Sequence, residues 1–193
     1  MRRNVLVFLG FMLMVVFLGC EMGNGDIISE ERNVKGFNGV KLGGVENVNT
    51  YPGESYRVVV KTDSNLMDKV LTTVSGNILQ ISQKSGPFNP TELTVDVYMP
   101  ELKRIALSGT GNIKVSSGSS PELNISLSGT GNIDAQNFQV QNVTINQSGT
   151  GNSKIWAVNT LNVTLSGTGN IFYKGDPEII KTITGTGNIK PLS

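Results

Sequence analysis

The chain offers little that could carry out catalysis. It contains no histidine and a single cysteine, which excludes an intrachain disulfide and a cysteine-clustered metal site. Glycoside hydrolysis needs two carboxylates at a fixed separation, and no Asp-rich Ca²⁺ repeat is present. In the C-terminal half the acids are scattered singly, at Glu122, Asp134, Asp176 and Glu178. We therefore expect no enzyme, no cofactor and no metal, and a polysaccharide-active enzyme is the least favoured hypothesis.

Cys20 is the one residue whose surroundings predict a specific modification. Two arginines near the N-terminus precede an apolar run, which ends in Phe17-Leu18-Gly19-Cys20. This order is typical of a bacterial lipoprotein signal peptide, with the lipid attached to the cysteine thiol. It predicts a signal peptide over residues 1–19, and a lipidated Cys20 with a tether over residues 20–32.

The segment before Cys20 leaves one alternative open. Phe17 and Leu18 are bulkier than the Leu and Ala or Ser usual at these positions, and the alternative is an uncleaved N-terminal anchor. The apolar run is short for a full membrane span. Under either interpretation the remainder of the chain is exported and tied to a membrane.

Two aromatic residues are candidate ligand contacts. Trp156 and Phe172 follow successive copies of a repeated pentapeptide and fall on the polar face of the strands predicted there. Exposed rings on neighbouring strands could stack on a sugar. The alternative is that a turn tucks Trp156 into a corner. Four exposed threonines of the pentapeptides offer a second surface for glycans, or for ordered water as in ice-binding proteins: Thr110, Thr130, Thr150 and Thr168.

Gln147 and Ser153 are polar residues at positions that are apolar in the other copies. Both would point inward, beside the glycines of the third copy. One interpretation is a buried hydrogen-bonded pair or a trapped water, since buried amides need partners. The other is a small polar pocket.

Five near-copies of the pentapeptide Ser-Gly-Thr-Gly-Asn must position these residues. They begin at Ser108, Ser128, Ser148, Ser166 and Thr184, so their spacings are 20, 20, 18 and 18 residues. A fixed period near 20 residues is typical of a stacked solenoid. An antiparallel meander with Gly-rich hairpin turns is the alternative, but it gives no reason for so regular a period.

The residues around each pentapeptide alternate with a period of two. Ile105 and Leu107 precede the first copy, and Ile113 and Val115 follow it. This alternation predicts strands with one buried face. The two glycines of each copy fall on the buried side, where glycine allows positive φ and close backbone approach. Ten glycines are therefore expected to be structural: Gly109, Gly111, Gly129, Gly131, Gly149, Gly151, Gly167, Gly169, Gly185 and Gly187.

The sequence before the repeats is strand-rich but irregular. Residues 33–104 are predicted to form irregular coils or a β-rich cap, and residues 105–193 the regular repeats, within one domain over 33–193. In the last copy Lys181 and Pro191 fall on inward columns. Lys and Pro on a terminal strand block pairing with other chains.

The order of these motifs resembles a bacterial envelope family labelled "putative auto-transporter adhesin, head GIN domain", over roughly residues 33–190. The segments that carry the resemblance are Phe37 to Val40, Tyr51-Pro52-Gly53-Glu54, Asn65-Leu66-Met67-Asp68, Gly76 to Ile81, Met99-Pro100-Glu101-Leu102 and the five pentapeptides. The resemblance implies an all-β, right-handed parallel β-helix on an exported, often lipidated protein. It supplies no catalytic residues.

Charge limits the partners further. Without residues 1–19 the chain has 14 basic and 15 acidic residues, so it offers no electrostatic attraction for nucleic acid or anionic lipid. The favoured hypothesis is a non-enzymatic, lipid-anchored protein of the periplasm or cell surface that binds glycan or protein as an adhesin does. The alternative is a structural or sensory periplasmic module that works through protein–protein contacts.

Overall fold

A computed structural model describes residues 20–53, 55–84, 86 and 88–192, so the predicted signal peptide over 1–19 lies outside it. The strands of the N-terminal part are β1 (Glu21–Met22), β2 (Ile27–Arg32), β3 (Gly39–Leu42), β4 (Asn47–Pro52), β5 (Arg57–Asp63), β6 (Val70–Ser75), β7 (Ile78–Gln83), β8 (Phe88–Asn89) and β9 (Leu93–Met99), with a 3₁₀ helix η1 (Ser64–Lys69) between β5 and β6. The strands that follow are β10 (Arg104–Leu107), β11 (Asn112–Val115), β12 (Gly118–Leu127), β13 (Ile133–Gln147), β14 (Ser153–Leu165), β15 (Ile171–Lys174), β16 (Glu178–Ile183) and β17 (Ile189–Pro191).

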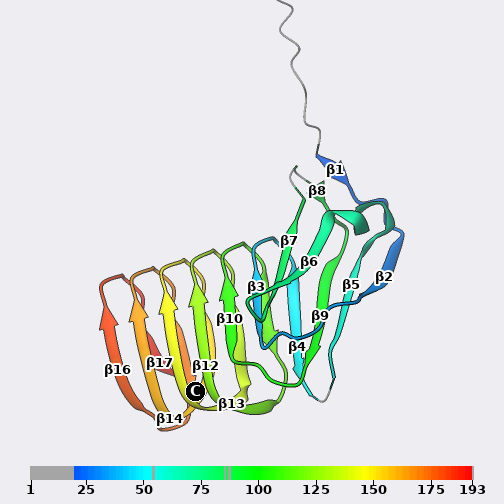
Figure 1. The fold of residues 1–193 in the computed structure, drawn as a ribbon. Helices are drawn as coiled ribbons and strands as arrows, with labels where there is room; N and C mark the ends of the chain where they lie inside the picture. Colours follow the sequence, from blue (N-terminus) through cyan, green and yellow to red (C-terminus); the bar gives the residue numbers. More distant parts are fainter. Residues whose placement is uncertain (1–19, 54, 85, 87, 193) are drawn as a thin grey trace, which may run out of the picture.

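The strands after residue 103, here called the repeat stack, pair in parallel, and the register shifts only within the pair β13 and β14, after Ala135 and after Val140. Ile105 lies beside Ile125, Ile125 beside Ile145, and Ile145 beside Val163. Like side chains are thus stacked on the inner face, where these four residues are buried. The period seen in the sequence corresponds to one passage of the chain around this stack (Figure 1).

Two ladders of strands share the repeat stack. The first ladder contains β3, β10, β12, the ends of β13 and β14, and β16. The second contains β4, β11, the beginnings of β13 and β14, β15 and β17. The pentapeptides form the corners that lead from the first ladder to the second. Because β13 and β14 belong to both ladders, the sheet turns back on itself around the core.

The predicted right-handed parallel β-helix is wrong as a description of the chain. The fold is all-β, but its main sheet is a mixed, fifteen-stranded sheet, whose path of eleven strands from β2 to β6 is nearly closed and barrel-like. β2 and β5 pair antiparallel, as do β5 and β9, and β6 and β7. The strands before residue 104 therefore continue the main sheet instead of adding a separate cap, except for β1 and β8, which form a two-stranded sheet of their own. Whether a strand there pairs parallel or antiparallel depends on the edge of the sheet that the chain reaches. Residue types carry no signal for that.

The N-terminal segment is built into the fold instead of forming a free tether. β2 lies within residues 20–32 and pairs along its whole length with β5. Asp63, at the end of β5, fixes the residues that precede β2. Its buried carboxylate accepts hydrogen bonds from the Gly25 N–H at 2.7 Å and the Thr91 N–H at 2.7 Å. Burial alone would raise the pKa of Asp63, but these backbone donors outweigh it and lower that pKa. Cys20 thus directly precedes an ordered strand.

The two ends of the molecule differ. β1 and β8 lie at one end, and β16 lies at the other (Figure 1). Lys181, predicted to point inward, is exposed on β16, together with Ile180 (55% exposed) and Ile183 (40%). No further strand covers β16 within the part of the chain that the structure describes.

Candidate ligand-binding face

The outer face of the second ladder brings together the candidate aromatics and several charged residues. Strand pairing places one side chain from each of seven neighbouring strands in a row: Asp96, Asn49, Lys114, Asp134, Lys154, Phe172 and Lys190. Two positions further along the strands, Tyr98 lies beside Tyr51, and Trp156 beside Lys174. We call this surface the ladder face.

Two hollows lie on the ladder face. One, of about 330 Å³, is lined by side chains of β13, β14 and β15 together with the adjoining corner: Asn132, Ile133, Asp134, Asn152, Lys154 and Phe172. The other, of about 170 Å³, lies over β4 and β11 and is lined by Asn49, Thr50, Tyr51, Lys114 and Ser116. Because β11 is the neighbour of β13, the two hollows lie over five successive strands. We call them together the trough.

Trp156 and Phe172 both point outward and are half-buried, as their predicted parity requires. Phe172 forms part of the trough wall. The indole of Trp156 is covered, because the Lys174 ammonium lies 3.9 Å from the centre of its ring. A cation at this distance is attracted by the ring face. Phe172 therefore lines a hollow of the ladder face, whereas one face of the Trp156 ring is occupied by Lys174.

A second aromatic platform on the ladder face was not predicted from the sequence. The rings of Tyr51 and Tyr98 are stacked, with centroids 4.7 Å apart and an interplanar angle of 16°. The Arg57 guanidinium lies over Tyr98, 5.8 Å from the ring centre. Partial burial raises the pKa of Tyr51, and the nearby Asp96 carboxylate and Tyr98 add to the effect. The Tyr51 hydroxyl is protonated at neutral pH, as that of an ordinary tyrosine is, and can donate a hydrogen bond.

The charges of the ladder face are unequally satisfied. Asp134 accepts hydrogen bonds from the backbone and side-chain amides of Gln136, and Asp96 accepts one from the Asn49 amide at 2.9 Å. The ion pairs found among the described residues use other cations, namely Arg32, Arg57, Lys61, Lys69 and Lys103. Among the described residues, the lysines of the ladder face thus form no ion pair within 4.0 Å, although Asp134 is the cross-strand neighbour of Lys114 and Lys154, and the acids accept hydrogen bonds from neighbouring amides.

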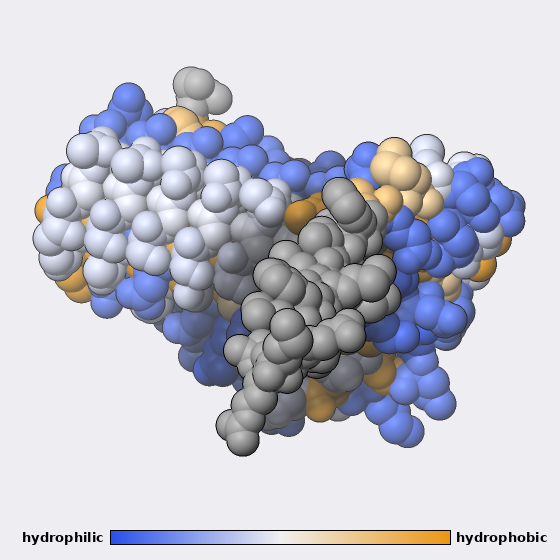
Figure 2. All heavy atoms as spheres, turned by 90° about the horizontal axis from the view of Figure 1, so that it is seen from above, coloured by the Kyte–Doolittle hydropathy of each residue, from blue (hydrophilic) through white to orange (hydrophobic). Residues whose placement is uncertain are grey.

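The threonines of the pentapeptides lie on a different surface. Thr110, Thr130, Thr150 and Thr168 are exposed along the line of corners, beside the exposed serines of the same copies. Figure 2 shows this surface as a regular pale array that runs along the repeat stack. An asparagine ladder separates it from the trough: the backbone N–H of Asn152 donates to Asn132 Oδ1 at 3.0 Å, and that of Asn170 to Asn152 Oδ1 at 2.9 Å.

Gln147 and Ser153 are buried and hydrogen-bonded to each other. The Ser153 hydroxyl donates to Gln147 Oε1 at 2.8 Å, and Gln147 Nε2 donates to the Gly151 carbonyl at 2.8 Å. The geometry is that of the buried-pair interpretation, and neither residue lines the hollows described above. The pair also spans the corner of its own repeat, between the end of β13 and the start of β14.

The ten corner glycines lie where neighbouring corners approach most closely. A Cβ on Gly151 would overlap the carbonyl oxygen of Gly131, and one on Gly131 would overlap that of Gly111. The sequence also suggested a positive φ at these glycines. The described glycines with positive φ are others, namely Gly25, Gly36, Gly76, Gly86, Gly118 and Gly175. Close approach, and not backbone conformation, explains glycine in the pentapeptides.

A sixth corner, missed in the sequence, precedes the five. Gly43 to Asn47 lies against the first pentapeptide: the Thr110 N–H donates to the Gly44 carbonyl at 2.9 Å and the Asn112 N–H to the Glu46 carbonyl at 3.2 Å. Glu46 therefore occupies the position of the second glycine. Its side chain is fully buried, and neither carboxylate oxygen has a hydrogen-bond partner among the described residues. Burial raises the pKa of Glu46; its own backbone N–H and the Gln83 amide lie near enough to oppose this shift, but neither makes a hydrogen bond of good geometry to the carboxylate.

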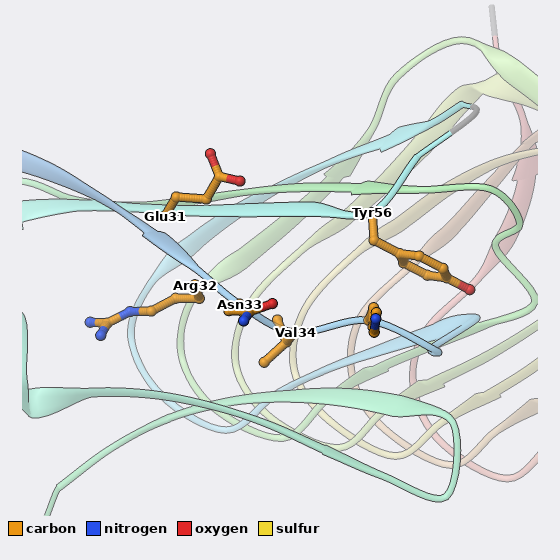
Figure 3. A pocket seen from close by; sticks show the side chains of 6 residues that line it. Glu31, Arg32, Asn33, Val34 and Tyr56 are labelled. Atoms are coloured by element: carbon orange, nitrogen blue, oxygen red, sulfur yellow. The ribbon is translucent and has the colours of Figure 1, made fainter.

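A larger hollow than these two, away from the ladder face, has a less coherent lining. It measures about 510 Å³ and is lined by Glu31, Arg32, Asn33, Val34, Lys35 and Tyr56. Figure 3 shows Glu31, Arg32 and Val34 pointing in different directions instead of converging on one point. Glu31 is also engaged by Arg57, and Arg32 by Glu30. We therefore prefer the trough as the candidate site.

Among the described residues, no group of three or more His, Cys, Asp or Glu side chains is placed to hold a metal ion. Nor does the described part of the chain contain a helix long and apolar enough to cross a membrane. Cys20 is exposed, with a free thiol.

The sequence matches one family twice, over residues 36–118 and 108–177. The family is described as "Putative auto-transporter adhesin, head GIN domain". This description is of an adhesin, a class of exported or cell-surface proteins, and not of an enzyme. No curated protein matches the chain.

Solved structures resemble the chain in fold. A putative adhesin from Bacteroides fragilis NCTC 9343 has 21% identity and a TM-score of 0.63, covering 89% of this chain and 99% of its own. A putative adhesin from Parabacteroides merdae ATCC 43184 has 20% identity and a TM-score of 0.50, covering 89% and 98%. A putative lipid binding protein from Parabacteroides distasonis ATCC 8503 has 20% identity and a TM-score of 0.51, covering 91% and 100%. At these identities the likeness concerns the fold alone.

Proposed function

We propose that this chain, which belongs to the head GIN domain family, is a lipid-anchored envelope protein that binds glycans through the trough, as an adhesin. The observation that carries this proposal is the hollow over β13–β15. It combines an aromatic ring, Phe172, with amide, carboxylate and ammonium groups of Asn132, Asn152, Asp134 and Lys154. A ring that stacks on a sugar, surrounded by groups that hydrogen-bond its hydroxyls, is a common arrangement for sugar binding.

The anchor is the second part of the proposal. Cys20 carries the lipid, and the membrane is a partner through it alone. Since Cys20 directly precedes ordered strands, the folded domain is held close to the membrane surface. Globomycin, which blocks cleavage of lipoprotein signal peptides, should cause the unprocessed chain to accumulate. A Cys20→Ala variant should not incorporate labelled fatty acid.

Glycan binding is tested with the purified chain on a glycan array and then by titration with the best ligand. Phe172→Ala should weaken binding about tenfold or more, and Trp156→Ala should weaken it less, because Lys174 already covers the indole. Tyr56→Ala is the matched control, since Tyr56 is an exposed aromatic (39% exposed) outside the trough. Unchanged binding by Phe172→Ala would exclude the trough.

A second candidate function is a periplasmic module that works through protein–protein contacts. The uncovered strand β16, with exposed Ile180 and Ile183, favours it. Protease added to intact cells separates the two functions. A chain that is shielded from external protease cannot act as an adhesin, whereas cleavage would favour the adhesin.

A further inference from the structure

We infer that the trough takes a linear acidic glycan, one that bears carboxylates along its length, and holds it on two aromatic platforms. This inference rests on the proposed function and specifies the ligand of the same site. It depends on the two hollows lying over adjacent strands, on the second platform and on the lysines of the ladder face that form no ion pair among the described residues.

The trough is long enough for a chain rather than a single sugar. Its hollows lie over five successive strands, β4, β11, β13, β14 and β15. At a strand spacing of about 4.8 Å, the four steps between the outermost strands span about 19 Å. A ligand that fills the trough must run across the strands, along the direction in which the repeats are stacked.

An aromatic platform lies at each end of this path. Phe172 on β15 and Trp156 on β14 mark one end, and the stacked Tyr51 and Tyr98, on β4 and β9, mark the other. All four rings belong to the outward-facing positions of their strands. Rings at two ends of a polar trough suit a chain of sugar rings, because each platform can stack on a separate sugar.

The charges between the platforms select an acidic chain. Lys114 and Lys154 line the two hollows and have no carboxylate within 4.0 Å among the described residues. Asp134, between them, accepts hydrogen bonds from Gln136 but keeps its charge, so two ammonium groups and one carboxylate leave this stretch with a net charge of +1. Carboxylates of the ligand would therefore meet available ammonium groups, and salt should weaken the attraction.

The test compares oligogalacturonides of three and eight units with neutral gluco-oligosaccharides of the same lengths, by titration at low and high salt. The acidic octasaccharide should bind most tightly. Tyr98→Ala should weaken its binding threefold to tenfold and leave the trisaccharide unchanged, and Tyr98→Phe should behave as wild type. Lys114→Gln and Lys154→Gln should reduce the preference for acidic chains, whereas Lys35→Gln, outside the trough, should not.

The outcomes separate the inference from the proposed function. The inference would be overturned if neutral chains bound as well as acidic ones, or if Tyr98→Ala left binding of the octasaccharide unchanged. The proposed function would still hold in that case, provided that Phe172→Ala weakened glycan binding. Unchanged binding of every glycan by Phe172→Ala would overturn both. Tighter binding of poly-glutamate than of the acidic octasaccharide would replace the glycan with an acidic polypeptide.

Discussion

The corners of the repeat stack and the first corner, Gly43 to Asn47, have the same backbone path but different side chains. In the repeat stack the second glycine lies against the carbonyl group of the preceding corner, as Gly151 does against Gly131. In the first corner Glu46 holds that position, and the neighbouring chain is the end of hairpin β6–β7 instead of another corner. The comparison shows that the second glycine of a pentapeptide is required because the preceding corner packs against it. Where no corner lies beneath, a long side chain fits.

Gly151→Ala should give the largest loss of stability, because its Cβ would overlap the Gly131 carbonyl oxygen and force neighbouring repeats apart. Overpacking of this kind costs about 3 kcal/mol. Chemical denaturation followed by circular dichroism measures it. Gly53→Ala is the control, since the nearest atom to the added Cβ would be the Tyr51 carbonyl oxygen at 3.9 Å. A loss below about 1 kcal/mol for Gly151→Ala would contradict the explanation by close approach.

Gln147→Leu should give the next largest effect, within the same repeat. It leaves the Ser153 hydroxyl and the Gly151 carbonyl without their partner, at a cost of about 2 kcal/mol in the free energy of unfolding. Adding Ser153→Ile should recover most of this loss, because the apolar columns of the other repeats are then restored. The double variant should keep full glycan binding. Loss of binding with stability recovered would revive the polar pocket.

The sequence predicts much of the repeat stack because its information is local. The spacing of the pentapeptides sets the register, and the alternation around Ile105 and Leu107 sets the buried face. The antiparallel pairing of β5 with β2 and β9 has no such signal. The direction of each of these strands follows from the connection that brings it to the sheet, not from its own residues.

The candidate site divides in the same way. Phe172 and Trp156 were predicted because both lie at fixed offsets from a pentapeptide. Tyr51 and Tyr98 are far apart in the sequence and meet only because β4 pairs with β9. The first corner was missed because Gly-Gly-Val-Glu-Asn keeps only the second and last residues of the pentapeptide. A search for the Gly-x-x-Asn pattern beside a strand would have found it.

Glu46→Gln should have the smallest effect, and one of opposite sign. The raised pKa means that the folded chain binds the Glu46 proton more tightly than the unfolded chain. The contribution of protonated Glu46 to the free energy of unfolding is therefore fully present below the unfolded pKa of about 4.5. It is lost as the pH rises through the higher pKa of the folded chain. Glutamine cannot lose a proton, so the variant escapes this loss.

The two chains should be equally stable near pH 4, and Glu46→Gln should be more stable by about 1 kcal/mol near pH 8, because a buried carboxylate without partners is costly. Urea unfolding at both pH values measures the difference. Glu178→Gln, at an exposed position on β16, should show no such dependence. If Glu46→Gln were instead less stable at pH 8, the carboxylate would be engaged by a partner, and the first corner would be a site of its own. If Glu46→Gln is stabilising, the first corner has no role of its own. It is then simply the first corner of the stack, where glycine is not required because no other corner packs against it on that side.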